Sequence, residues 1–257
     1  MLSVVGDVQI HARLFVKRTP WLYRPAKRLT GRGAPDHLSD RATDLCIEGY
    51  PSSGNSFSFA VLCLANPKIR IAHHCHSVAN FQLALSYGVP AVCLIRRPED
   101  AIASRVARFE GRIRSAILEY VSFYDFVFAR LDELTVVTFD EVTRHTDVFL
   151  DRVARATGLP FDVGDIEQLR NSAADYMTRW TAQNAKPENI SLPRTARDRA
   201  KAAIRDEIIG TEPFGKARLL WREITSCASR LPVATSHRCG EKDTGTPAGC
   251  SQHGNRP

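Results

Sequence analysis

Small polar residues between two apolar runs form the most informative stretch of this sequence. Leu45–Tyr50 is a short apolar run, Pro51-Ser-Ser-Gly-Asn-Ser56 follows it, and the chain becomes apolar again from Phe57. We predict a strand, a loop and a buried helix in that order. The backbone N–H groups of such a loop and of the first helical turn converge, and the helix dipole adds positive potential there. The pattern therefore indicates a site for a phosphate or a related anion, which Gly54 lets the main chain approach closely.

The spacing from Gly49 to Ser56 also fits the phosphate-binding pattern G-x-x-x-x-G-K-[ST], with one mismatch. Asn55 stands where the pattern has lysine, and that lysine neutralises the β- and γ-phosphates of ATP or GTP. Ordinary nucleotide hydrolysis is therefore disfavoured. A tight turn without a ligand would use the same small residues, so the loop alone leaves both interpretations open.

A second signature makes the interpretation more specific. Pro51-Ser-Ser-Gly-Asn-Ser-Phe57 resembles the 5′-phosphosulfate loop of the sulfotransferases, often written P-[KR]-S-G-x-[ST]-[WF]. Further along, Arg96-Arg-Pro-Glu-Asp-Ala-Ile-Ala-Ser104 is similar to R-x-P-x-D-x-x-x-S, the 3′-phosphate element of that family. Two motifs in the family's order are more specific than either alone. The resemblance extends over residues 44–160, and more weakly to about residue 223.

The resemblance implies a donor co-substrate, 3′-phosphoadenosine 5′-phosphosulfate, and no metal. Arginine suits a 3′-phosphate because its planar fork donates two charge-assisted hydrogen bonds. The alternative for Arg96 is a surface ion pair with Glu99 or Asp100. The implied donor-binding residues are Ser52, Ser53, Gly54, Asn55, Ser56 and Phe57 on the 5′ side, with Phe57 near the adenine, and Arg96 and Ser104 on the 3′ side.

Three histidines follow the second predicted strand, in His73-His-Cys-His76. In the cytosolic sulfotransferases a histidine at this place takes the proton of the acceptor hydroxyl. Because side chains alternate along a strand, we expect His74 and His76 to share a face and His73 to oppose them. We expect His74 to be the catalytic base, with His76 as its neighbour or substitute.

One position departs from the family pattern. Ser52 replaces the loop lysine or arginine that assists the leaving group, and the C-terminal R-K-G-x-x-G loop of the family is absent, with only Arg194 and Arg197 near its place. Three functions stay open: a sulfotransferase, a P-loop kinase-like phosphotransferase, and a catalytically weak nucleotide-binding relative. Other cations that could serve the leaving group are Arg97, Arg105, Arg112 and Arg114.

The remaining elements support an α/β fold. Strands and helices alternate and the strands are rich in β-branched residues, which predicts a three-layer α/β/α domain with a central parallel sheet, P-loop NTPase-like. Residues 167–189 give no clear element. The other predicted strands are Lys68–His74, Ala91–Ile95 and Thr135–Phe139, and the predicted helices lie near Val78–Tyr87, Arg112–Leu131, Asp147–Thr157, Arg197–Ile209 and Phe214–Ile224, with a helix from Pro98.

Composition limits the partners. The chain has 257 residues, a net charge of +7 and a pI near 9.2, which favours an anionic ligand. We find no nucleic-acid-binding motif and expect no nucleic acid partner; the acceptor should be a small molecule or a carbohydrate. No apolar run is long enough to span a membrane, and the first residues are too polar for a secretion signal. With seven cysteines and no C-x-x-C, we expect a cytoplasmic protein.

The two ends differ from the middle. Residues 1–43 are basic with interleaved aromatics, which we interpret as a partly ordered arm packing on the domain; weak peripheral membrane contact is the alternative. Residues 44–228 form the α/β domain. Residues 229–257 are poor in large apolar side chains, so we predict a disordered tail. His237, Cys239, Cys250 and His253 in that tail match no familiar zinc-finger spacing.

Overall fold

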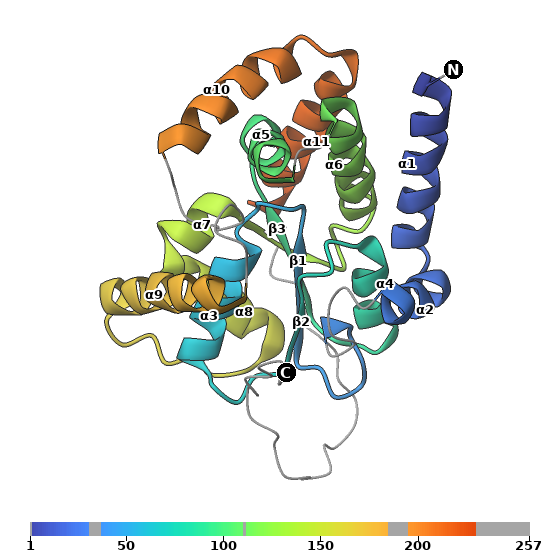
Figure 1. Ribbon diagram of the computed structural model, residues 1–257. Coiled ribbons are helices and arrows are strands. Elements are labelled where there is room, and N and C mark those ends of the chain that lie inside the picture. Colours follow the sequence, from blue (N-terminus) through green and yellow to red (C-terminus); the bar gives the residue numbers. More distant parts are fainter. Residues whose placement is uncertain (1, 31–36, 110–111, 185–194, 230–257) are drawn as a thin grey trace.

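A central parallel sheet organises the computed structural model, which describes residues 2–30, 37–109, 112–184 and 195–229 (Figure 1). Within those ranges the sheet has four strands in the order β2-β1-β3-β4, and every neighbouring pair is parallel. The predicted parallel α/β architecture is confirmed. The strands are β1 Leu45–Gly49, β2 Ile71–His73, β3 Ala91–Ile95 and β4 Thr135–Thr138.

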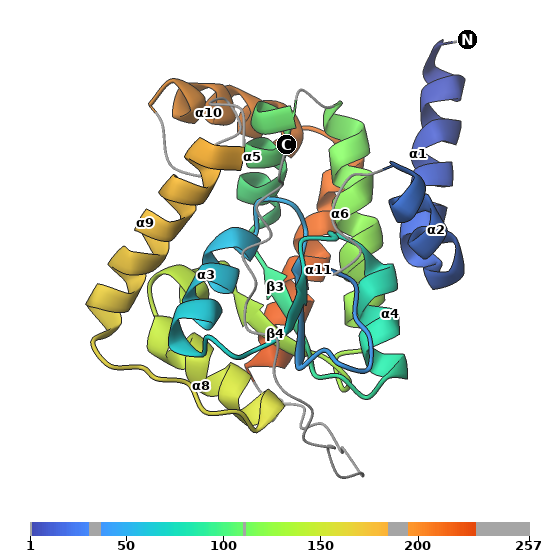
Figure 2. The ribbon, with the colours of Figure 1, turned by 60° about the horizontal axis from the view of Figure 1, so that its bottom comes forward.

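Helices cover both faces of the sheet (Figures 1 and 2). One face packs on α4 Val78–Ser86, α5 Pro98–Phe109, α6 Ile113–Phe128 and α11 Glu212–Ala228. The other face packs on α3 Asn55–Ala65, α8 Thr146–Thr157 and α9 Ile166–Asn184. The further helices are α1 Leu2–Arg18, α2 Pro20–Thr30, α7 Phe139–Thr143 and α10 Thr195–Ile209.

Strand side chains divide between two hydrophobic cores. Cys93 and Ile95 of β3 enter the core formed with α4, α5, α6 and α11, whereas Val92 and Leu94 enter the core formed with α3, α8 and α9. All five β3 side chains are buried, as expected for a strand covered on both faces. Because the strands are parallel, the carboxyl ends of β1, β2 and β3 lie at the same edge of the sheet.

The basic N-terminal segment forms two helices in its described part. Helix α1 packs against α4 and α6, and α2 packs against α4. Lys17 of α1 donates a 2.6 Å hydrogen bond to Glu119 of α6, a carboxylate that is 3% exposed and also pairs with Arg105. The division into arm, domain and tail stays a prediction, and residues 230–257 lie outside the described part of the chain.

The structure corrects two local expectations. Residues predicted to have no clear element form the 19-residue helix α9, because apolar side chains such as Ala173 and Met177 give an otherwise polar helix a packing stripe. The second strand is shorter than predicted and ends at His73.

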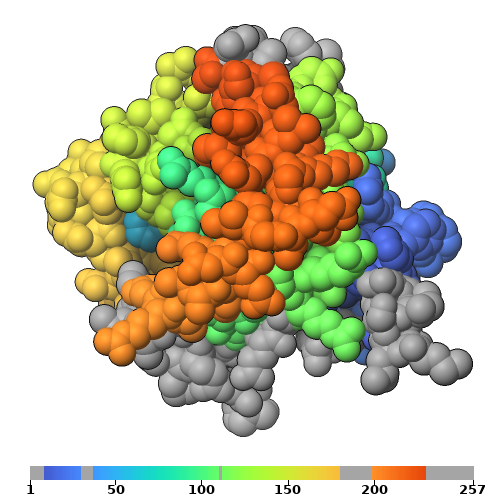
Figure 3. Space-filling view, turned by 90° about the horizontal axis from the view of Figure 1, so that it is seen from above, coloured from blue at the N-terminus to red at the C-terminus, as the bar shows by residue number. Residues whose placement is uncertain are grey.

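Helix α10 packs along α5. In the space-filling view from above, α10 and α11 form an orange to red band across the face of the molecule (Figure 3). No described helix has the length and apolar content needed to span a membrane.

Gly49 generates a stability prediction, because a Cβ at this position would lie 2.7 Å from the Leu94 carbonyl oxygen and 2.9 Å from its Cβ. Gly49→Ala should destabilise the fold by about 1–3 kcal/mol through overpacking between β1 and β3. Gly215→Ala is the matched control: it lies in α11 with nothing within 4 Å of the added Cβ, so it should be neutral or stabilise by up to about 1 kcal/mol. Urea unfolding of both variants measures the difference, and equal effects would contradict the close-approach argument.

Candidate functional site

The loop between β1 and α3 has the backbone of an anion site. Ser52 and Gly54 both have positive φ, 71° and 98°, and the Ser53 N–H donates to the Tyr50 carbonyl at 3.1 Å. Left-handed residues in a turn point successive N–H groups into a concavity suited to anions. A Cβ on Gly54 would lie 3.3 Å from the ring of Phe139. The positive φ therefore favours glycine at position 54, and the Phe139 ring leaves little room for a side chain there.

The polar side chains of the loop divide into two groups. Ser53 Oγ lies 3.4 Å from the Tyr124 hydroxyl, and Asn55 Nδ2 donates to the Tyr50 carbonyl at 3.3 Å. Both side chains are buried and support the loop from within. The Ser52 hydroxyl and Asn55 Oδ1 are buried without a hydrogen-bond partner, and such groups call for a ligand or a water. The Ser53 hydroxyl is thus occupied within the fold, whereas the Ser52 hydroxyl still lacks a partner.

Arg96 follows β3 and braces the same loop. Its Nη1 donates to the Ser52 carbonyl at 2.9 Å, and its guanidinium lies 4.0 Å from the centroid of the Phe139 ring. Neither predicted ion pair partner, Glu99 or Asp100, is within salt-bridge distance of it in the described contacts. Burial lowers the pKa of Arg96, Asp100 opposes that shift, and the positive charge of Arg205 adds to it.

Arg205 is a cation that sequence reasoning missed. It reaches from α10 to α5, where its Nη2 lies 2.5 Å from an Asp100 oxygen, which brings a second guanidinium to the neighbourhood of Arg96. Ser104, on α5, is only 7% exposed. Arg194 and the side chain of Arg197 lie outside the described residues. Arg205 is the cation from this C-terminal region whose charge acts on Arg96.

The cations considered for the leaving group are placed differently from the expectation. Arg105 is committed to Glu119 at 2.8 Å, and Arg97 lies over the Trp221 ring of α11 at 5.6 Å. Arg112 and Arg114 are exposed. Arg108 of α5 is a further cation near the histidines: with burial as the main cause, its charge helps to lower the pKa of both His74 and His76, as does that of Lys27 at His74 and of Lys17 at His76.

His73 is the last residue of β2, and His74–His76 form a turn after it, so the expected alternation of their side chains is wrong. His74 and His76 have φ values of 57° and 46°, a region that non-glycine residues rarely adopt. The rings of His73 and His74 contact each other through their Nδ1 atoms, although we expected these side chains to oppose one another. His74 Nε2 also lies 2.9 Å from Ser56 Oγ on α3. Both ring nitrogens of His74 are therefore engaged.

His76 has a different environment. Its Nδ1 lies 2.8 Å from the Gly49 carbonyl oxygen, and because a carbonyl only accepts, Nδ1 must carry the proton. The neutral ring then has its lone pair on Nε2, for which the described contacts include no partner. Burial lowers the pKa of His76 to about 4, although the hydrogen bond to the Gly49 carbonyl raises it. Burial also lowers the pKa of His74, to about 3. Both rings are neutral at pH 7.

Glu48, which sequence reasoning also missed, holds this turn. It is fully buried in β1, and its two carboxylate oxygens accept from the N–H groups of Cys75 and His76, both at 2.8 Å. Asn80 Nδ2 donates a third hydrogen bond at 2.9 Å. The sequence did contain a signal for this residue, because Glu48 is a glutamate inside an otherwise apolar strand. Burial raises the pKa of Glu48 to about 7, against these three hydrogen bonds and the charge of Lys27.

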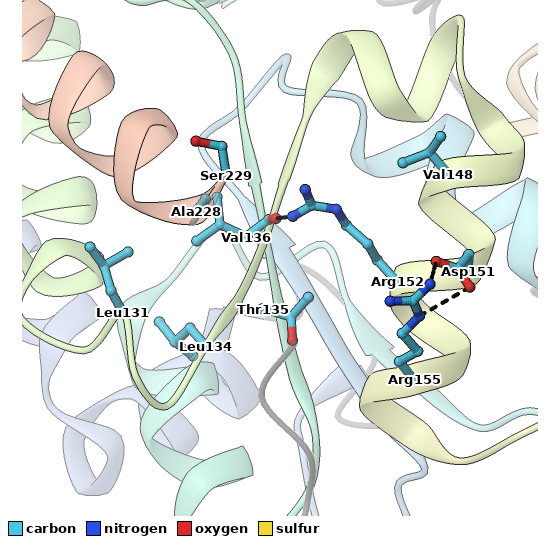
Figure 4. A pocket seen from close by; sticks show the side chains of 10 residues that line it. All are labelled: Leu131, Leu134, Thr135, Val136, Val148, Asp151, Arg152, Arg155, Ala228 and Ser229. Carbon is cyan, nitrogen blue, oxygen red and sulfur yellow. Dashed lines mark hydrogen bonds and ion pairs between the residues drawn. The ribbon is translucent and has the colours of Figure 1, made fainter. Parts of the chain in front are cut away.

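Two cavities differ in their position relative to these residues. A small one beside His76 is lined by Tyr50 and Pro51 of the loop together with residues of α1 and α6. A larger one of about 300 Å³ lies beside β4, between α8 and α11, where Arg152 donates to the Val136 carbonyl (Figure 4). The larger cavity includes the first residues of β4, at the amino end of the strand, and none of the predicted site residues lines it. Only the small cavity belongs to the candidate site.

Comparison with known proteins adds little to this geometry. No protein-family model matches the sequence, and no curated protein does. Among solved structures, mouse sulfotransferase SULT7A1 complexed with PAP has a TM-score of 0.43 and 12% sequence identity, over 74% of this chain and 91% of that chain. A similarity at this level does not transfer a function, so function has to be argued from the side chains of this protein.

The buried neutral histidines predict acid lability. In the unfolded chain a histidine binds a proton below about pH 6.5, whereas His73, His74 and His76 resist protonation in the fold. The free energy of unfolding should therefore fall as the pH drops below 6.5. Each of these histidines can contribute up to about 1.4 kcal/mol for each pH unit. Glu48, with its raised pKa, opposes this between pH 4.5 and about 7, but it is one group against three. Calorimetric melting between pH 8 and 5 should show a falling Tm. His74→Gln should flatten the slope, exposed His11→Gln should not, and identical slopes would contradict the prediction.

Proposed function

We propose that this protein is a sulfotransferase that moves a sulfuryl group from 3′-phosphoadenosine 5′-phosphosulfate to a hydroxyl group of a small-molecule or carbohydrate acceptor. One observation carries the proposal: the anion-binding loop and the histidine turn are joined by hydrogen bonds. Ser56 Oγ lies 2.9 Å from His74 Nε2, and the Gly49 carbonyl lies 2.8 Å from His76 Nδ1. A phosphosulfate held at the N-terminus of α3 would thus lie next to a neutral imidazole.

The donor fits the charge and polarity of this edge. The left-handed residues of the loop, the N-terminus of α3 and the orphan Ser52 hydroxyl suit the 5′-phosphosulfate. Arg96, with Ser104 and with Arg205 as the added cation, would hold the 3′-phosphate. The donor supplies an activated sulfuryl group; the residues of this chain orient it and exclude water.

His76 is the better candidate for the base. The Gly49 carbonyl fixes the proton on Nδ1, so the lone pair is on Nε2, and His76 lines the small cavity together with Tyr50 and Pro51. Accepting the hydroxyl proton there would leave the acceptor oxygen free to attack sulfur. His74, with both nitrogens engaged, instead links the turn to α3. This revises the expectation from the sequence, in which His74 had that role.

A P-loop kinase is less well supported. Phosphoryl transfer from ATP needs a cation at position 55, and Asn55 is 4% exposed and bonded to the Tyr50 carbonyl. Ser52 in place of a cation still favours a slow enzyme, or a binding protein, over a fast enzyme. Isothermal titration with 3′-phosphoadenosine 5′-phosphate, AMP and ATP with Mg²⁺, followed by sulfate transfer to a panel of hydroxyl acceptors, tests the proposal. Preference for ATP would overturn it.

Arg96 gives a prediction on donor binding. Arg96→Ala should weaken binding of 3′-phosphoadenosine 5′-phosphate by about 1.5–3 kcal/mol, the range of a charge-assisted hydrogen bond, and AMP binding less. Because Arg96 also holds the Ser52 carbonyl, equal losses for the two ligands would mean that it acts through the loop alone. Arg97→Ala, which removes an exposed guanidinium stacked on Trp221, is the matched control and should change neither affinity.

The two histidines give a prediction on turnover. His76→Asn keeps a donor for the Gly49 carbonyl and tolerates the positive φ, but it removes the base; kcat should fall by about 10²–10⁴ with nucleotide affinity unchanged. His74→Gln keeps a polar group near Ser56 and should cost far less. Single-turnover sulfate transfer at saturating donor measures both. A larger loss in His74→Gln would return the role of base to His74.

A further inference from the structure

The turn that carries the candidate base is strained, and its restraints are unusual. Two non-glycine residues two positions apart, His74 and His76, have φ values of 57° and 46°. A left-handed residue of this kind is strained and persists only when its surroundings impose it. The two amide groups between these residues, Cys75 N–H and His76 N–H, both donate to one carboxylate, that of Glu48.

The same carboxylate lies directly before Gly49 in β1, so it connects the turn to the strand that leads into the anion-binding loop. Its third donor, Asn80 Nδ2, has a fixed orientation, since Asn80 Oδ1 accepts from the Ser39 N–H at 2.8 Å and Nδ2 also donates to the His37 carbonyl at 3.2 Å. All three hydrogen-bond partners of Glu48 among the described residues are donors. A protonated Glu48 would carry an O–H that none of these three groups can accept, and its oxygens would bind the N–H groups more weakly because they have lost their charge.

We propose that ionised Glu48 is a positioning residue that holds the His74–His76 turn in its left-handed conformation and thereby aims His76 Nε2 at the acceptor. Protonation of Glu48 releases the turn and disengages the base. The geometric part stands on the hydrogen bonds alone; the catalytic part rests on the proposed function.

The groups around Glu48 set the pH at which this happens. Lys27 and Tyr23 face it from α2, Cys75 and His76 from the turn, Asn80 from α4, Cys46 from β1 and Cys93 from β3. Burial dominates and raises the pKa of Glu48 to about 7, whereas the pKa of His76 lies near 4. Below pH 7 the carboxyl is protonated while His76 is still neutral. The acid limb of activity should therefore have a midpoint near pH 7, set by Glu48 and not by the base.

Amide NMR of protein labelled with ¹⁵N-cysteine and ¹⁵N-histidine tests the geometric part without any substrate. The Cys75 and His76 amides should shift together with one midpoint near pH 7, and Glu48→Gln should abolish that titration. The matched control is Asp44→Asn, a buried carboxylate just before β1 that accepts the Arg70 N–H at 3.1 Å; it should leave the titration unchanged. Amides that do not titrate, or that titrate equally in Glu48→Gln, overturn the proposal.

Kinetics test the catalytic part. Glu48→Gln should lower kcat by about 10²-fold, the cost of a base displaced by about 1 Å, and should remove the acid limb while leaving affinity for 3′-phosphoadenosine 5′-phosphate intact. Lys27→Gln removes a positive charge that stabilises the ionised form of Glu48 and leaves the Glu48 side chain itself unchanged, so the acid limb should move to higher pH. This variant keeps the test valid if Glu48→Gln does not fold. An unmoved limb in Lys27→Gln overturns the proposal. Failure to bind the nucleotide at all would overturn the proposed function and leave the NMR result to decide on Glu48.

Discussion

The close approach of β1 to β3 at Gly49 is the constraint on which the rest of the site depends. The missing Cβ leaves the space in which the Leu94 carbonyl accepts a 2.7 Å hydrogen bond from the Tyr124 hydroxyl, which also contacts Ser53 of the loop. The carbonyl of Gly49 in turn binds His76 Nδ1. One glycine therefore couples the register of two strands to the loop and to the tautomer of a histidine.

Two buried carboxylates show how differently this fold treats charge. Glu119 is surrounded by Lys17, Arg13 and Arg105, and these cations hold its pKa down at about 2 although burial opposes them. Glu48 is satisfied mainly by N–H groups, so burial keeps its pKa near 7. A carboxylate with this environment costs stability when it ionises, which is the pattern of a group retained for geometry and not for the strength of the fold.

The N-terminal helices take part in the same network. The Tyr23 hydroxyl donates to the Cys75 carbonyl at 3.0 Å, Lys27 Nζ donates to Cys75 Sγ at 2.9 Å, and the Ser77 hydroxyl donates to the Lys17 carbonyl at 2.6 Å. The histidine turn is thus held from the sheet on one side and from α1 and α2 on the other. The many basic residues of this segment account for its ion pairs. The residues through which it contacts the turn are not marked by any sequence motif.

The sequence by itself determined the parallel sheet, the loop and the order of the two motifs, because the alternation of strands and helices, Gly54 and the small residues at positions 51–56 act through local geometry. The strand Ala91–Ile95 was predicted with its observed bounds. Tertiary structure decided which nitrogen of which histidine is available, that Arg105 is committed to Glu119, that Arg205 approaches Arg96, and that Glu48 restrains the turn. Apart from the contact between His73 and His74, these outcomes depend on hydrogen-bond and charge partners 14 to 109 positions away along the chain, and spacing in one sequence carries no information about such partners.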